Sequence, residues 1–274
     1  LAHIQYDPPL AGVQRPATVA LAPPGADCGD WRGALRAELN DPLKVVFQGA
    51  YPAACGERVW PVAYPAPREF AARAVEGMWR ELGGKLTGSV REGKVPAGLK
   101  PAFVSTSPAL AEVVRDVNKY SNNVMAQHVF LTLARQKNGV ATLDGARETL
   151  RQWWQARLAD VDAPAPDNGA GLSRDARITA QALARMLQAA WASPVMPELV
   201  ASLPIAGVDG TLRRSQSRSA AHLKTGSLRD VMAVAGYVHA QSGRRYVLVA
   251  IVNHPNANAA RPVLDALTDW AAKD

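Results

Sequence analysis

The pattern that most restricts the fold of this chain is a change of periodicity in its last third. Residues 221–226, 231–239 and 246–252 are short runs with the composition of strands. The Gln-Ser-Gly triplet at 241–243 predicts a hairpin turn between the last two runs. Residues 259–273 then place apolar side chains three or four apart, as in an amphipathic helix. The sequence therefore predicts an antiparallel meander followed by a closing helix.

Helical periodicity dominates the chain ahead of these strands. A stripe that starts at the expected N-cap Asp30 and later stripes predict helices over 30–39, 68–82, 107–117, 123–135, 143–158 and 179–191. The segment 123–135 is apolar on every face, so we expect that helix to be buried. Residues 19–21 and 85–96 have strand or turn character.

A helical block followed by a meander predicts an α/β (α+β) fold, an antiparallel sheet flanked by helices. Three strands are few for this many helices. We therefore expect further strands from the N-terminal part of the chain or from a segment outside it.

Length and charge limit the class of protein. The 274 residues suffice for one large domain or for a core with a smaller lobe. No apolar run approaches the roughly 18 residues of a membrane span, so we predict that the chain does not span a membrane. The net charge of +7 is scattered, which predicts that nucleic acid is not a partner. The densest basic cluster, Arg213, Arg214 and Arg218, is either a solvated loop or a patch for an anionic polymer such as cell-wall material.

The chain holds two cysteines, Cys28 and Cys55, in surroundings rich in Gly, Pro and Ala. Two thiols without a nearby His cluster do not supply the four soft ligands of structural zinc, so we expect no metal. The pair forms a disulfide or remains as two free thiols. We predict the disulfide, on the condition that the protein is exported, and a loop of this length would then add about 3–4 kcal/mol of stability.

Tyr120-Ser121-Asn122-Asn123 lies between two predicted helices. A Ser and an Asn two residues apart at a helix start can both face one cleft. There the Ser121 hydroxyl could relay a proton and the Asn123 amide could hold a substrate amide. The alternative is an ordinary helix cap, in which these side chains satisfy free backbone donors.

His222-Leu223-Lys224-Thr225-Gly226-Ser227 begins the meander. Strand alternation places His222, Lys224 and Gly226 on one face, with a bulge possible at the glycine. A lysine facing a cleft can bind a carboxylate or lower the pKa of a neighbouring hydroxyl, and a glycine lets substrate backbone approach. The alternative is a strand end whose lysine extends to solvent.

Together, Ser-x-Asn at the start of one helix and Lys-Thr-Gly on a late strand form two motifs of penicillin-binding enzymes. The chain resembles the class C low-molecular-mass penicillin-binding proteins, the D-alanyl-D-alanine carboxypeptidases/endopeptidases of peptidase family S13. Residues 167–173 resemble that family's Asp-Gly-Ser-Gly-Leu-Ser segment, from which Asn168 and Ala170 depart. Residues 208–212 are similar to its Gly-x-Asp-Gly-Thr-Leu stretch.

The resemblance is close over residues 100–274 and loose over 1–99. It implies a penicillin-binding, β-lactamase-like transpeptidase lobe at 100–274. For 1–99 it implies a remnant of an accessory domain inserted into the catalytic domain.

The resemblance also implies a nucleophilic serine in a Ser-x-x-Lys motif, and no serine of the chain has Lys three residues later. The chain also begins at Leu1 without an initiator Met. We therefore expect that an N-terminal segment with the nucleophile is missing and that the chain is inactive alone. A non-catalytic cell-wall-binding relative is the alternative.

For the complete site, the resemblance implies attack by the missing serine on the D-Ala-D-Ala amide of a peptidoglycan stem peptide, without a cofactor. Ser121, helped by Lys224, would protonate the leaving amine, and Asn123 would hold the substrate side amide. Lys224 and Thr225 would bind the terminal carboxylate, Gly226 would let the substrate approach, and the Ser227 N–H would form half of the oxyanion hole. β-Lactams would be covalent inhibitors. This substrate and the predicted disulfide place the protein in the periplasm or elsewhere outside the cytoplasm.

Overall fold

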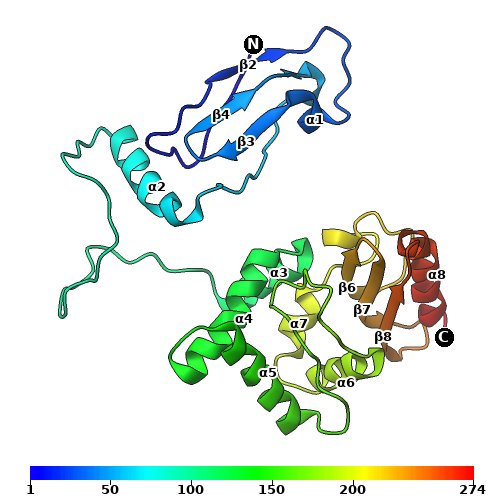
Figure 1. Cartoon of the computed structure of the whole chain (residues 1–274). Helices are drawn as coiled ribbons and strands as arrows, with labels where there is room; N and C mark the ends of the chain where they lie inside the picture. The colour runs from blue at the N-terminus through cyan, green and yellow to red at the C-terminus, as the bar shows by residue number, and fades with distance from the viewer. The chain divides into compact units, whose positions relative to one another are not determined.

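The structure, a computed structural model, describes residues 1–274 (Figure 1). It divides into two compact units, Leu1–Phe103 and Val104–Asp274. None of its helices combines the length and the apolar character needed to cross a lipid bilayer.

The first unit is built from short strands. One sheet has the order β1-β2-β5 and a separate hairpin pairs β3 with β4. The strands are β1 (Ala2–His3), β2 (Thr18–Leu21), β3 (Ala37–Asp41), β4 (Lys44–Phe47) and β5 (Ala50–Tyr51). The unit also contains the helical segments α1 (Trp31–Leu35), η1 (Ala53–Cys55) and α2 (Pro67–Glu81). The strand expected at 19–21 is confirmed as part of β2.

A disulfide joins Cys28, ahead of α1, to Cys55 at the end of η1. The two Cα atoms are 4.8 Å apart, and Cys55 is buried. Trp31, three residues after Cys28, packs edge-to-face with Tyr51 and Trp60. The predicted disulfide is therefore confirmed, and it fastens the start of α1 to the segment after β5.

The helix predicted over 30–39 is wrong beyond Leu35. Asp30 caps it as expected, since its side chain accepts from the Gly33 N–H, but Arg36 is left-handed with φ 46° and β3 follows. Gly49 explains this end: its N–H donates to the Leu35 carbonyl, and a Cβ added to it would lie 1.8 Å from the Ala34 oxygen. Close contact with the β4–β5 connection and pairing with β4 thus override the local helical periodicity. Residues 85–96, expected as strand and turn, contain no strand.

The second unit contains the predicted meander, with sheet order β6-β7-β8 and antiparallel pairing throughout. Its strands are β6 (Ala221–Leu228), β7 (Val231–His239) and β8 (Arg245–Asn253). Gly226 pairs with Ala233 in an uninterrupted register, so β6 carries no bulge at the glycine.

Helices cover the sheet in two layers (Figure 1). On one face, Leu223, Val234 and Leu248 pack with Leu264 of α8 (Arg261–Ala272), the closing helix that the sequence predicts. Cluster membership alternates along the strands, and Tyr237 packs instead with residues of α6 (Ala180–Trp191) and α7 (Met196–Ser202). Lys224 neighbours Leu223, and alternation turns its side chain away from the α8 layer.

The remaining helices of this unit are α3 (Leu110–Tyr120), α4 (Asn123–Asn138) and α5 (Leu143–Arg157). The expectation that the helix at 123–135 is buried on every face is wrong. Phe130 and Ala134 of α4 are buried, whereas Val124 is 69% and Leu133 42% exposed. Phe130 and Ala134 pack with Ala146 of α5, and this contact buries one stripe of α4 only.

Candidate active site

The two sequence motifs meet at a single hydrogen bond. Lys224 lies on β6, and its Nζ donates to the Ser121 Oγ at 2.6 Å and to the Thr225 carbonyl at 2.8 Å. Both side chains are partly buried, and burial lowers the pKa of Lys224. The arrangement therefore joins a serine hydroxyl to a lysine whose ammonium form is disfavoured by its surroundings.

Ser121 has an unusual backbone conformation. It follows the last residue of α3 with φ 53° and ψ 49°, the left-handed region that non-glycine residues rarely occupy. Such a conformation costs on the order of 1–3 kcal/mol and is concentrated at functional sites. The capping role that the motif could have played falls to Asn122, whose Oδ1 accepts from the Met125 N–H at 3.0 Å. Ser121 and Asn123 are thus free of that role.

Asn123 opens α4 and fastens the loop at 167–173. Its Nδ2 donates to the Ala170 carbonyl at 2.6 Å, and the Gly169 N–H donates to Gln127 of α4 at 2.8 Å. A Cβ added to Gly169 would lie 2.2 Å from the Phe130 Cβ, so the loop needs a glycine there. The side-chain Oδ1 of Asn123 accepts no hydrogen bond from the protein, which leaves it available to an N–H donor.

The rest of the Lys-Thr-Gly motif lies toward the end of β6. The Thr225 hydroxyl is 2.8 Å from that of Thr211, whereas Gly226 and Ser227 are exposed. A Cβ added to Gly226 would meet only the Ala233 Cβ, at an ordinary 3.5 Å. Packing within the fold therefore does not require glycine at this position.

His222, on the same face as Lys224, lies against a second histidine. Its ring centroid is 5.4 Å from that of His239, and its Nδ1 lies 3.2 Å from the Val200 carbonyl. The buried His239 Nε2 has no hydrogen-bond partner. Burial lowers the pKa of both imidazoles. These contacts make the histidines part of the packing behind the site.

Sequence reasoning missed Lys119, which is buried at the end of α3 and contacts Asp209 at 2.6 Å. Asp209 belongs to the stretch 208–212, but no pattern in the sequence indicates a partner on α3. The signal that could have drawn attention to Lys119 is its position two residues before Ser121.

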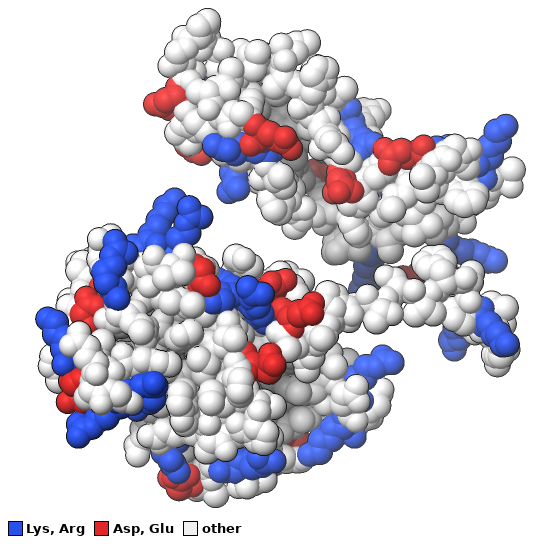
Figure 2. Space-filling model, turned by 180° about the vertical axis from the view of Figure 1, so that it is seen from behind, with Lys and Arg blue, Asp and Glu red and all other residues white.

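The basic cluster lies in the loop between η2 (Gly210–Leu212) and β6. Arg213, Arg214 and Arg218 are exposed, and none forms an ion pair. Ser215, Ser217 and Ser219 of the same loop hold it on α8 through Asp265 and Asp269. On the face shown in Figure 2, Lys and Arg are interspersed with Asp, Glu and neutral residues. No group of three or more His, Cys, Asp or Glu side chains is arranged to hold a metal ion.

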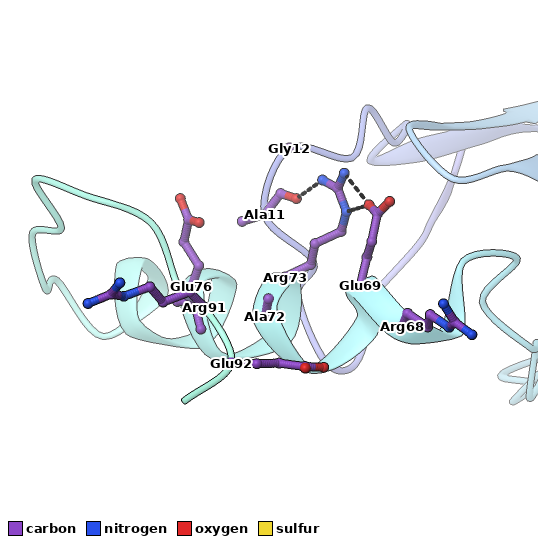
Figure 3. A pocket seen from close by; sticks show the side chains of 10 residues that line it. Ala11, Gly12, Arg68, Glu69, Ala72, Arg73, Glu76, Arg91 and Glu92 are labelled. Carbon is purple, nitrogen blue, oxygen red and sulfur yellow. Dashed lines mark hydrogen bonds and ion pairs between the residues drawn. The ribbon is translucent and has the colours of Figure 1, made fainter. Parts of the chain in front are cut away.

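A separate pocket of about 370 Å³ lies in the first unit, beside α2 (Figure 3). Arg73 crosses it, donating to Glu69 and to the Ala11 carbonyl. Its lining mixes acidic and basic side chains and includes none of the motif residues.

Comparison with known proteins identifies the family. The model of the D-Ala-D-Ala carboxypeptidase 3 (S13) family matches residues 33–274. The chain belongs to this family. The resemblance read from the two motifs is therefore confirmed.

Two proteins that are similar in sequence are carboxypeptidases. A D-alanyl-D-alanine carboxypeptidase of Actinomadura sp. is 29% identical over 206 residues, which cover 71% of this chain and 38% of that protein. The carboxypeptidase DacB of Mycolicibacterium smegmatis is 31% identical over 187 residues, which cover 63% of this chain and 40% of that protein. The matched part of the chain thus spans about two fifths of the length of these relatives.

The fold agrees with this assignment. Penicillin-binding protein 4 of Haemophilus influenzae matches 94% of this chain and 63% of its own chain, with a TM-score of 0.68 and 20% identity. The predicted α/β fold, an antiparallel sheet flanked by helices as in a penicillin-binding protein, is confirmed.

Proposed function

We propose that this chain is the part of a serine-type D-Ala-D-Ala carboxypeptidase/endopeptidase that binds the substrate and protonates the leaving group. The observation that carries the proposal is the 2.6 Å contact between Lys224 and Ser121, because it brings together two motifs that are distant in the sequence. The substrate would be a peptidoglycan stem peptide, and β-lactams would acylate the complete site.

The contacts support distinct roles for the motif residues. Lys224 donates to the Ser121 oxygen, so the Ser121 O–H is free to donate its proton to the leaving amine while Lys224 replaces it. The free Oδ1 of Asn123 would accept the N–H of the substrate amide. Lys224 and Thr225 would bind the terminal carboxylate, and exposed Gly226 would admit the substrate backbone. The Ser227 N–H would supply one donor of the oxyanion hole.

The nucleophile of this reaction would come from a segment outside these 274 residues, since the chain contains no Ser-x-x-Lys. The serine oxygen would attack the amide carbonyl and pass its proton to the motif lysine. The C–N bond would then break to leave an acyl-enzyme, which water would hydrolyse.

The edge of the sheet offers a place for such a segment. β8 is the outermost strand of its sheet, and a groove of about 620 Å³ runs between it and α8. Trp270 in this groove is 73% exposed. A strand added to β8 would satisfy its free backbone groups and cover the apolar groove. We also propose that residues 100–274 form the transpeptidase-like lobe and that residues 1–99 are a remnant of an inserted domain.

We also propose that the protein acts outside the cytoplasm, in the periplasm or an equivalent compartment. The Cys28–Cys55 disulfide supports this, because such bonds persist in oxidising compartments. Peptidoglycan, the proposed substrate, lies there as well.

The second candidate is a wall-binding relative that performs no acyl transfer. The observation that favours it is the same absence of Ser-x-x-Lys in a chain that keeps the other two motifs.

Intact mass after incubation with a penicillin separates the two. The chain alone and the full product of the reading frame that encodes it would be compared. We expect a covalent adduct on the full product only. An adduct on the chain alone would identify one of its own serines as the nucleophile, and no adduct on either would favour the wall-binding relative.

A further inference from the structure

Lys119 is the one charged residue of the chain that is fully buried, with 5% exposure. A charge in such a position is costly unless it is paired and hydrogen-bonded. The proposed mechanism, which uses Ser121, Asn123 and Lys224, gives Lys119 no role. Its contacts show what it does.

Asp209 is its partner. The Lys119 Nζ lies 2.6 Å from Oδ2 of Asp209, and the other carboxylate oxygen accepts from the Ile205 N–H at 2.8 Å. Burial raises the pKa of Asp209, but the hydrogen bonds from Lys119 and Ile205 outweigh it and the pKa is lowered. The carboxylate is therefore ionised. It forms an ion pair with Lys119 and accepts a hydrogen bond from the backbone N–H of Ile205.

Two further contacts press the same segment onto the end of α3. The Asn118 amide donates to the Ser202 hydroxyl at 2.7 Å. A Cβ added to Gly210 would lie 2.5 Å from the Lys119 carbonyl oxygen, and Gly210 has φ +53°. The segment 202–210 can approach α3 this closely because a glycine stands at the contact.

The other side of this segment is bonded to β6. The Ala206 N–H donates to the Ala221 carbonyl, and the Leu223 N–H donates to the Pro204 carbonyl, so residues 204–206 pair with the outer edge of the strand. Thr211 extends this contact to Thr225. The segment 202–211 thus bridges α3, which ends at Ser121, and β6, which carries Lys224.

We propose that Lys119 and Asp209 are positioning residues whose ion pair holds this bridge and thereby sets the contact between Ser121 and Lys224. Lys119 stands two residues before Ser121, and the bridge pairs with the residue on each side of Lys224. The catalytic meaning of this contact rests on the proposed function, whereas the mechanical coupling does not. An apolar pair could be as stable in this position, but it would not demand one geometry as a hydrogen-bonded ion pair does.

The test measures the titration of Lys224 in this chain by NMR of labelled lysine side chains, with Lys224→Met to assign the signal. In Lys119→Met we expect the pKa of Lys224 to move up toward that of an exposed lysine, because a loosened bridge admits water to the ammonium group. Lys119→Arg retains the charge, so the pKa of Lys224 in this variant should lie close to its lowered value in the parent. Leu264→Ala, in the α8 layer, should lower thermal stability without moving the Lys224 titration.

Thr211→Val keeps the test decisive if Lys119→Met does not fold. It removes the contact between the Thr211 and Thr225 hydroxyls at the exposed end of the bridge, and we expect it to move the Lys224 titration in the same direction. An unchanged Lys224 titration in a folded Lys119→Met, or in Thr211→Val where only that variant folds, would overturn the proposal. So would an equal movement in Leu264→Ala, because loss of stability alone would then explain it.

A second measurement addresses catalysis. If the full product is acylated by penicillin, we expect Lys119→Met to slow acylation about tenfold to a hundredfold, as for other small misplacements of catalytic groups, and Lys119→Arg to recover most of the rate. Failure of the unmodified full product to react would refute the proposed function and leave the Lys224 titration to decide the coupling.

Discussion

Lys224 donates a hydrogen bond to Ser121 across 103 residues of sequence, and it does so without an acidic partner. Burial disfavours its charged form, as the lowered pKa indicates. A lysine in this position therefore does not contribute to the stability of the fold in the way that a paired surface lysine can. Its presence is better explained by the proposed chemistry.

Replacement of Lys224 by Met should separate stability from function. We expect the free energy of unfolding to stay the same or to rise by about 1 kcal/mol, because a partly buried lysine without an acidic partner is exchanged for an apolar side chain of similar length. Penicillin acylation of the full product should be lost. Thermal denaturation and intact mass give the two readouts, with Lys137→Met on the exposed surface of α4 as the control. A marked loss of stability in Lys224→Met alone would show that the lysine is structural.

Gly226→Ala tests whether the glycine of the Lys-Thr-Gly motif serves the substrate. The added Cβ meets only Ala233, at 3.5 Å, so we expect the free energy of unfolding to lie within about 1 kcal/mol of that of the parent. Acylation of the full product should slow, because the methyl group obstructs close approach of the substrate to the strand. Gly236→Ala is the contrasting control. Its Cβ would lie 2.1 Å from the His222 carbonyl oxygen and should destabilise the sheet. Equal acylation rates in Gly226→Ala and the parent would argue against a substrate role.

The elements with strong periodicity were predictable from the sequence. The meander β6-β7-β8, the closing helix and the N-cap of α1 at Asp30 follow from alternation, turn residues and capping chemistry. The short elements were not. α7 has seven residues, fewer than the roughly 11–18 over which a helical period can be recognised in a sequence. β3 begins inside an apparent helical stripe because its pairing partner and Gly49 decide the local structure.

The site was predictable as two motifs, and their meeting could be inferred only from family resemblance. Nothing in the sequence places Ser121 beside Lys224, since the contact depends on how α3 and β6 are held together. The Lys119–Asp209 pair illustrates the limit more clearly. A lysine near the end of a helix is normally solvated, and only the fold reveals that this one is buried.

Removal of the disulfide should weaken the first unit. Its loop has a sequence separation of 27, for which we expect Cys28→Ser with Cys55→Ser to lower the free energy of unfolding by about 3–4 kcal/mol. Hydrogen exchange at the amides of β2 and β5 is the direct measurement, and the amides of β7 serve as the internal control. An intact mass of the unreduced parent equal to that of the free dithiol would contradict the bridge itself.

The two stacked histidines predict a loss of stability in acid. Burial lowers the pKa of His222 and His239, and Lys119 and Arg245 respectively act in the same direction, while Asp209 opposes the shift at His222. Between their lowered pKa values and about 6.5, the ordinary value, the unfolded chain therefore binds more protons than the folded one. The contribution of the two neutral histidines to the free energy of unfolding is then fully present above about pH 6.5, and it is lost as the pH falls toward their lowered pKa values.

Replacement of His239 by Phe tests this dependence. Its Nε2 is buried without a partner and its ring lies beside Trp191, so an apolar ring should be tolerated there. We expect the melting temperature of His239→Phe to decline less steeply between about pH 8 and pH 5 than that of the parent, because one of the two groups that must bind a proton has been removed. His128→Gln, at an exposed position on α4, should keep the slope of the parent. Parallel slopes in His239→Phe and the parent would mean that His239 does not contribute and that other groups govern the acid transition.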